Sequence, residues 1–173
     1  MTPHRVREIQ QLWVVALNYL DRAQALSDER RTYEQLLTSP DASVLALSAD
    51  LDSAAIRLAS LDDLLNGGMK AVRDRAYPKH SDSAGLPEEY IHVFLRDAVA
   101  HAEPVDGVDS RTYTKRQEWF RKRTLADTWR AMGTVRSRLQ TDIVNCCKSA
   151  QELRDWMKNE LETRLISMKK EAK

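Results

Sequence analysis

The sequence predicts an all-α protein, and three observations support this fold class. Leu and Ala number 20 and 19, whereas the β-branched Val and Ile number only 11 and 5. Gly and Pro number five each, too few for the many turns of a β-sandwich or barrel. Apolar residues recur at helical spacing along most of the chain. We find no short Val/Ile runs of the kind that a doubly wound α/β fold requires.

Two helices are predicted in the N-terminal third. Thr2-Pro3 is a start signal, and apolar spacing continues from Val6 to Leu37, so we expect one long helix ending near Thr38. Ser39-Pro40-Asp41 repeats that start signal, and a clean apolar stripe runs through residues 44–65 until Gly67-Gly68 ends the helix. Because the link between the two helices is short, we expect a long N-terminal antiparallel hairpin.

The remaining elements are shorter. A helix is predicted over 69–76, a polar loop over 78–86, and a helix from Pro87 to Ala102 or Glu103. A loop over 103–110 precedes further helix within 112–145, bent near Gly133. Ser149 and Glu152 form a capping box for a last helix that extends to Met168.

Length and composition suit one domain. The chain has 173 residues, of which 42% are hydrophobic and 31% charged, so we expect one helical domain over residues 1–173. No apolar stretch is long enough for a bilayer, and the N-terminus has no apolar signal region, so we expect a cytoplasmic protein that does not contact a membrane. The adjacent Cys146 and Cys147 are expected to be reduced.

One motif contains residue types that suit a catalytic site. Arg96-Asp97-Ala98-Val99-Ala100-His101 places an arginine, a polar residue and a histidine near the end of an apolar helix. With the spacing and the type of second residue both required, about 0.05 such matches are expected by chance in a chain of this composition. The motif is therefore the strongest functional signal in the sequence.

This motif resembles the R-[N/D/H]-x-x-x-H motif of the HEPN-domain ribonucleases, which are small all-α bundles that often act as toxins or antiviral defence effectors. The resemblance implies a HEPN-like helical bundle and a metal-independent endoribonuclease without a cofactor, whose site forms between two protomers of a homodimer. Carried over by position, it makes Arg96 and His101 the catalytic pair and Asp97 the supporting polar residue. It also implies an antitoxin or a defence-system protein as a further partner.

The residue chemistry agrees with this expectation. A histidine transfers protons near neutral pH, and an arginine presents a charged fork that fits phosphate oxygens. Asp97 and His101 are four residues apart, so the carboxylate can orient the imidazole on one helix face. Arg96 and His101 diverge by about 140° around an ideal helix. A site shared across a two-fold axis accommodates this divergence.

Structural explanations stand beside this interpretation. Arg96 can form a surface salt bridge with Glu89 or lie beside His92, and His101 can bond free carbonyls at a helix end. His92 shares a face with Arg96 and is a weaker candidate for the same cleft.

A basic segment follows the motif. Residues 111–138 carry nine Lys or Arg and two acidic residues, a net charge of +7 in a chain whose total is +1. We predict that its cations bind RNA, namely Lys115, Arg116, Arg121, Lys122, Arg123 and Arg130. The interleaved aromatic residues Tyr113, Trp119, Phe120 and Trp129 either stack on bases or belong to the core, and their size favours the core.

Two functional hypotheses remain. The first is an RNA-cleaving homodimer that uses Arg96 and His101. The second is a non-catalytic helical bundle that binds a partner protein or nucleic acid without needing either residue. A nuclease assay on the wild type and on Arg96→Ala distinguishes them.

Overall fold

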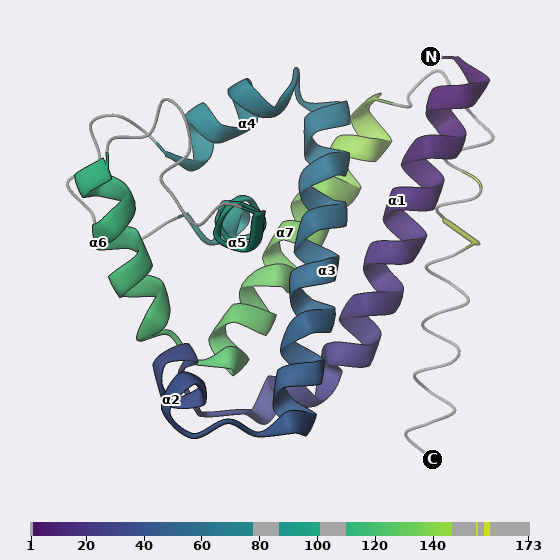
Figure 1. The fold of residues 1–173 in the computed structure, drawn as a ribbon. Coiled ribbons are helices and arrows are strands. Elements are labelled where there is room, and N and C mark those ends of the chain that lie inside the picture. The colour runs from purple at the N-terminus through teal and green to yellow at the C-terminus, as the bar shows by residue number, and fades with distance from the viewer. Residues whose placement is uncertain (1, 78–86, 101–109, 147–154, 156–157, 160–173) are drawn as a thin grey trace.

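The described part of the protein is almost entirely helical. The structure is a computed structural model, and it describes residues 2–77, 87–100, 110–146, 155 and 158–159. Its elements are shown in Figure 1 and run in the order α1 (Pro3–Arg22), 3-10 helix η1 (Ala23–Asp28), α2 (Tyr33–Thr38), α3 (Ala42–Leu65), α4 (Met69–Ala76), 3-10 helix η2 (Glu88–Tyr90), α5 (Ile91–Ala100), α6 (Ser110–Arg121) and α7 (Leu125–Cys146). Among the described residues the only β-pairing is an isolated bridge between Thr32 and Thr124. The predicted all-α class is confirmed.

Helix α3 is the centre of the bundle. It packs against α1, α4, α5 and α7. The Asp41 carboxylate caps its N-terminus by accepting from the backbone N–H groups of Ser43 and Val44. The residues on its inner faces are fully buried: Leu51, Ala54, Ala55, Leu58 and Leu61. The two alanines let neighbouring helices approach α3 closely. At its C-terminus Gly67 and Gly68 take φ of 89° and 96°, which ends the helix as predicted.

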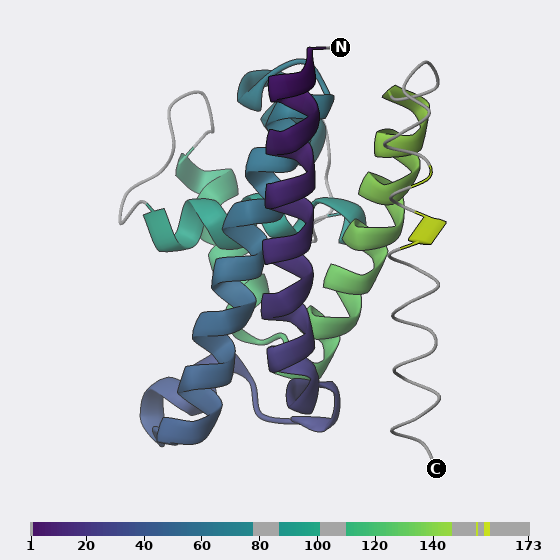
Figure 2. The same cartoon turned by 90° about the vertical axis from the view of Figure 1, so that its right-hand side faces the viewer.

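Helices α1 and α3 lie side by side and run in opposite directions (Figures 1 and 2). The segment between them differs from the prediction. Helix α1 ends at Arg22 rather than near Thr38, and η1 and α2 intervene before the short Ser39–Asp41 link. The reason is a second start signal, because the Thr32 side chain and Gln35 form a capping box that opens α2. The two long helices are therefore not joined by a tight turn.

The helical structure of the basic segment is also interrupted at a place that was not predicted from the sequence. The break falls between α6 and α7 at residues 122–124, while α7 continues through Gly133, where a bend was predicted. Thr124 caps α7 by accepting from Asp127 N at 3.0 Å. The start of α7 is also tied to the segment after η1, because Leu125 N donates to Arg31 O and Ala126 N donates to Glu29 O. This pairing explains why the chain breaks here.

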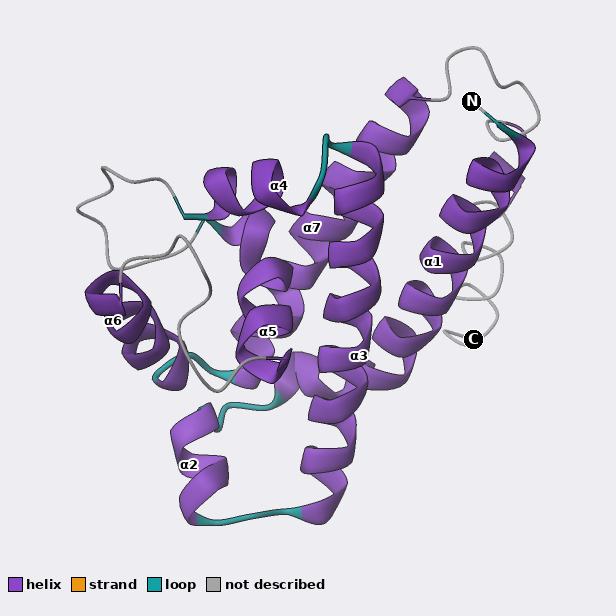
Figure 3. Cartoon of the chain, turned by 45° about the horizontal axis from the view of Figure 1, so that its top comes forward, coloured by secondary structure: helices purple, strands orange, loops and turns teal. Residues whose placement is uncertain are grey.

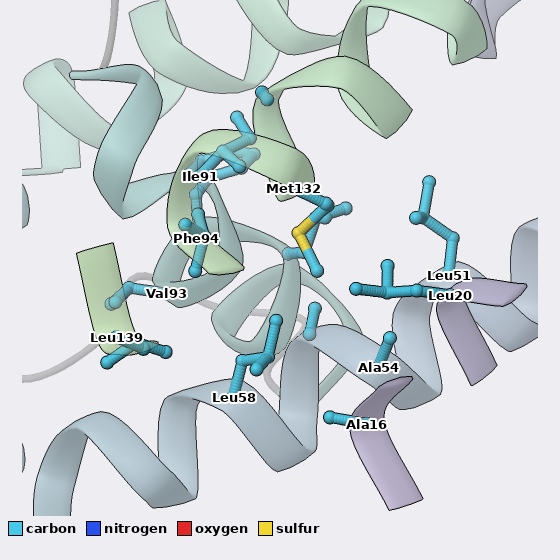
Figure 4. Packing of buried hydrophobic residues seen from close by; sticks show 14 of the residues in the cluster. Ala16, Leu20, Leu51, Ala54, Leu58, Ile91, Val93, Phe94, Met132 and Leu139 are labelled. Carbon is cyan, nitrogen blue, oxygen red and sulfur yellow. The ribbon is translucent and has the colours of Figure 1, made fainter. Parts of the chain in front are cut away.

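Helix α5 crosses α3 and supplies part of the core. Figure 1 views α5 end-on while α3 runs along the page, and Figure 3 shows α5 between α3 and α6. The core residues labelled in Figure 4 are Ala16 and Leu20 from α1, Leu51, Ala54 and Leu58 from α3, Ile91, Val93 and Phe94 from α5, and Met132 and Leu139 from α7. These apolar contacts fix the position of α5, which carries the motif.

The remaining predictions meet the structure in part. Helix α4 spans the predicted residues 69–76, and the helix expected from Pro87 begins as η2 and continues as α5. The predicted loop 78–86, residues 103–109 of the second loop, and nearly all of the last helix lie outside the described residues. None of the described helices combines the length and the apolar character needed to cross a bilayer.

Candidate functional site

Of the three motif residues with assigned roles, Arg96 and Asp97 lie on α5 within the described part of the chain. The Asp97 side chain is completely buried, whereas that of Arg96 is 27% exposed. Arg96 Nη1 donates to Asp97 Oδ1 at 2.8 Å. Arg96 therefore pairs with its chain neighbour and not with Glu89, the carboxylate that helical spacing had suggested. His101 lies outside the described residues, and so does its predicted pairing with Asp97.

A second helix brings another arginine to the same carboxylate. Arg73 Nη2 on α4 donates to Asp97 Oδ1 at 3.1 Å, and the Tyr77 hydroxyl lies 3.4 Å from Asp97 Oδ2. Arg73 lies within α4, and Tyr77 is the C-cap residue that follows the helix and donates its backbone N–H to Arg73 O. We call these four residues the Asp97 cluster: Arg73, Tyr77, Arg96 and Asp97.

The charge of the Asp97 cluster is unbalanced. Among the described residues, one buried carboxylate faces two guanidinium groups, which leaves one positive charge in excess within the cluster. The Arg73 and Arg96 side chains remain 22% and 27% exposed, so both keep some access to solvent. Two partly exposed arginines that a buried carboxylate holds in place are suited to bind an anion, since the guanidinium fork matches carboxylate and phosphate oxygens.

His92 takes part in a separate buried cluster. Its Nε2 lies 2.8 Å from Asp62 Oδ2, and neither side chain is exposed. Arg138 also bonds Asp62, and Asn66 Nδ2 donates to Asp62 Oδ1 at 2.8 Å. Asp142 completes the group by accepting from Arg138 Nη1 at 3.1 Å. The cluster joins α3, α5 and α7, and it buries the imidazole that had been a candidate for the cleft of Arg96.

Electrostatics fixes the protonation states in this second cluster. Burial lowers the pKa of His92 below its usual value, although the hydrogen bond to Asp62 acts in the opposite direction. Burial alone would raise the pKa of Asp62, but the hydrogen bonds from His92 and Arg138 together hold it well below its usual value. A neutral imidazole beside a carboxylate that is paired with Arg138 is therefore the state at neutral pH.

The predicted RNA-binding cations divide into two groups. Lys115, Arg121 and Lys122 are exposed and form no ion pair with a described residue. Arg123 instead binds Glu88 through two bonds of 2.7 and 2.6 Å, and Arg130 binds Asp127 at 2.8 Å. The side chain of Arg116 lies outside the described part.

The aromatic residues of the basic segment belong mainly to the core. Phe120 is buried and packs on Phe94 and Tyr33, with ring centroids 5.1 and 4.3 Å apart. Trp119 and Trp129 are half-buried and pack against the same core. The Tyr113 side chain is outside the described part. The core interpretation of the described aromatic residues is thus confirmed.

Sequence reasoning missed Arg73 and Tyr77. Their signal is weak, because Arg and Tyr four positions apart on a short helix are common. Their role follows only from the packing of α4 against α5, across a separation of 24 residues between Arg73 and Asp97. Among the described residues no group of three or more His, Cys, Asp or Glu side chains has the arrangement of a metal site.

Comparisons with models of known protein families, with curated proteins and with solved structures find no match to this chain.

Proposed function

We propose that the protein is a metal-independent endoribonuclease that uses Arg96 and His101 and acts as a homodimer with a HEPN-like bundle. One observation carries the proposal. Arg96 and Asp97 of the motif lie on the core helix α5, and the arginine is partly exposed and held by the buried carboxylate. Fixing a charged group in advance of binding is what stabilisation of a phosphoryl transition state requires.

The reaction divides between the two motif residues. In the first step His101 accepts the proton of the ribose 2′-hydroxyl, whose oxygen attacks the neighbouring phosphorus. The bond from phosphorus to the 5′-oxygen breaks, and a protonated His101 supplies the proton that this oxygen gains. Arg96 binds the phosphate oxygens, on which negative charge accumulates in the transition state. The products carry a 2′,3′-cyclic phosphate and a 5′-hydroxyl.

A two-fold arrangement supplies both proton transfers. Arg96 and His101 are separated by about 7.5 Å along an ideal helix and by about 140° around it. A two-fold axis near the end of α5 brings two copies of each residue to one cleft, so one histidine acts as base and the other as acid. An antitoxin or a defence-system protein that covers this cleft is the expected regulator.

A binding module is the second candidate, and one observation favours it. Lys115, Arg121 and Lys122 are exposed and form no ion pair with a described residue, so the α6 region offers free positive charge whether or not the protein cleaves RNA. Such a module binds a nucleic acid or an acidic partner and does not depend on Arg96.

The test is RNA cleavage in the presence of EDTA by the wild type and by Arg96→Ala. The substitution leaves Asp97 bonded to Arg73 and Tyr77, so the fold should persist. We expect Arg96→Ala to lower the rate by about 10²–10³-fold, the effect typical of removing one transition-state donor. Arg57→Ala is the control, because Arg57 is an exposed arginine on α3. Equal cleavage by Arg96→Ala and Arg57→Ala would reject the assigned role of Arg96, and no cleavage by the wild type would reject the proposal in favour of the binding module.

A further inference from the structure

Arg73 and Arg96 come from different helices and donate to the same atom. Arg73 Nη2 and Arg96 Nη1 lie 3.1 and 2.8 Å from Asp97 Oδ1. Two cations that meet at one oxygen repel each other, and a single carboxylate offsets only one of their charges. The arrangement is therefore favourable when a second anion is bound beside the first.

Both guanidinium groups have donors left for such an anion. Each guanidinium carries five N–H groups, and the bonds to Asp97 use one nitrogen of each arginine. Arg73 Nε is buried and has no hydrogen-bond partner among the described residues. A buried donor without a partner costs free energy, and a ligand removes this penalty only if it accepts from Nε itself; the exposed part of the Arg73 side chain offers the other contacts.

We propose that Arg73 and Arg96 together bind one phosphodiester group, with Asp97 as the residue that positions both arginines. This proposal rests on the proposed function and adds Arg73 on α4 as a substrate-binding residue. The ligand class is the RNA backbone phosphate, which carries one negative charge and neutralises the excess charge of the cluster. Each arginine is held by a carboxylate that is completely buried, so little rotamer entropy is lost when the phosphate binds.

Arg75, on the same helix as Arg73, supplies a matched control. It is exposed and lies about 200° away from Arg73 around the helix axis. Arg73→Gln and Arg75→Gln remove the same charge from the same helix, but only the first removes a member of the Asp97 cluster. Any general effect of net charge on RNA affinity appears equally in the two variants.

The experiment measures binding without cleavage. The probe is a fluorescent single-stranded RNA in which every 2′-hydroxyl is methylated, so the nucleophile is blocked, and the affinity is measured by anisotropy at several salt concentrations. We expect Arg73→Gln to weaken binding by about tenfold or more, as the loss of a charge-assisted contact predicts. The slope of the logarithm of the binding constant against the logarithm of the salt concentration should become shallower by about 0.7, the value for one phosphate contact to a single strand. Arg75→Gln should weaken binding by less than about threefold, because a single exposed charge acts only weakly through water and salt.

A second variant keeps the test decisive if Arg73→Gln does not fold. Arg73→Lys retains a positive charge beside Asp97 but loses the planar fork. We expect it to fold, as judged by its helical circular dichroism, and to bind the probe more weakly than Arg75→Gln does. If folded Arg73→Gln or Arg73→Lys binds as tightly as Arg75→Gln, Arg73 is a structural partner of Asp97 and the proposal is overturned.

Failure of this inference is distinct from failure of the proposed function. If unmodified RNA is cleaved but the Arg73 variants bind the methylated probe normally, the ribonuclease stands and the second phosphate ligand is wrong. If no RNA is cleaved but binding falls in the Arg73 variants alone, the paired arginines hold a phosphodiester in a protein that does not cleave it.

Discussion

His92 on α5 and Asp62 on α3 form a hydrogen-bonded pair with Nε2 and Oδ2 2.8 Å apart, and both side chains are completely buried. Arg138 on α7 bonds the same carboxylate, so one acidic group holds three helices. Buried ion pairs are costly to assemble, but breaking one is more costly still, because the remaining partner keeps its charge without compensation. Asp62 is therefore a structural anchor beneath the helix that carries Arg96.

Replacing that anchor should destabilise the protein severely. Asp62→Ala leaves the His92 ring without its acceptor and the Arg138 guanidinium with Asp142 as its remaining carboxylate, and we expect a loss of about 3 kcal/mol in the free energy of unfolding. Urea denaturation followed by circular dichroism measures this loss. Asp74→Ala, at an exposed position on α4, is the control and should change stability by less than about 0.5 kcal/mol. A similar small change in Asp62→Ala would contradict the anchoring role.

Asp52, a second acidic residue on α3, should lower the free energy of unfolding at neutral pH, whereas Asp62 raises it. Burial raises the pKa of Asp52 from 3.8 to about 6. Because the folded state then binds the proton more tightly than the unfolded state, this group's contribution to stability falls as pH rises from about 4 to about 6. Asp52→Asn removes this penalty, and we expect it to stabilise the protein by about 1–2 kcal/mol at pH 7.

The measurement for Asp52 is the difference in unfolding free energy between Asp52→Asn and the wild type at pH 7 and at pH 4. The difference should be much smaller at pH 4, where the folded wild-type carboxyl is protonated and the unfolded one, with a pKa of 3.8, is partly protonated. Asp28→Asn, at an exposed position, controls for the change in net charge. A difference that stays constant between the two pH values would show that ionisation of Asp52 does not affect folding.

Substitution by alanine should destabilise the protein at Gly68 and stabilise it at Gly133. Gly68 has φ of 96°, and its substitution forces a side chain into a conformation that L residues rarely adopt, although the nearest atom to the added Cβ is 3.9 Å away. Gly133 lies within α7, and nothing lies within 4 Å of its added Cβ. We expect Gly68→Ala to lower the free energy of unfolding by about 1–3 kcal/mol and Gly133→Ala to raise it by about 0.5–1 kcal/mol. Thermal unfolding of both variants gives the signs.

Mixing two inactive variants tests the shared site. Arg96→Ala and His101→Ala homodimers each lack one residue type, whereas their heterodimer keeps one Arg96 and one His101 on opposite chains. Because this heterodimer keeps only one of the two histidines, RNA cleavage should return in part after subunit exchange, above the background of either homodimer and in proportion to the heterodimer formed. Exchange that is verified by differently tagged chains but restores no cleavage would contradict a site formed from one residue of each protomer.

The sequence predicts local structure best where a single residue type dictates the backbone. Gly67 and Gly68 end α3 as expected, and α4 follows them with the predicted bounds. The break after Arg22 is less visible, because Leu26, Tyr33 and Leu36 continue the helical spacing across it. Its only local sign is the Thr32 and Gln35 capping box, which competes with a longer apolar pattern.

The site is predicted only in part for a different reason. Arg96 and Asp97 lie in one short motif and are adjacent in the chain, so their proximity is local. Arg73 and Tyr77 reach Asp97 through the packing of α4 against α5, and Asp62 reaches His92 through the packing of α3 against α5. No local pattern encodes either contact. The same holds for Arg123, whose pairing with Glu88 removes it from the set of free cations in the basic segment.

The most direct test of the central claim is the chemistry of the RNA ends produced by the wild-type protein in EDTA, with His101→Ala in parallel. If His101 transfers protons for an attacking 2′-hydroxyl, the products carry a 5′-hydroxyl and a 2′,3′-cyclic or 3′-phosphate. The His101→Ala protein should then form them about 10²–10⁴-fold more slowly. Products with a 5′-phosphate, or equal cleavage by the wild type and His101→Ala, would contradict the account.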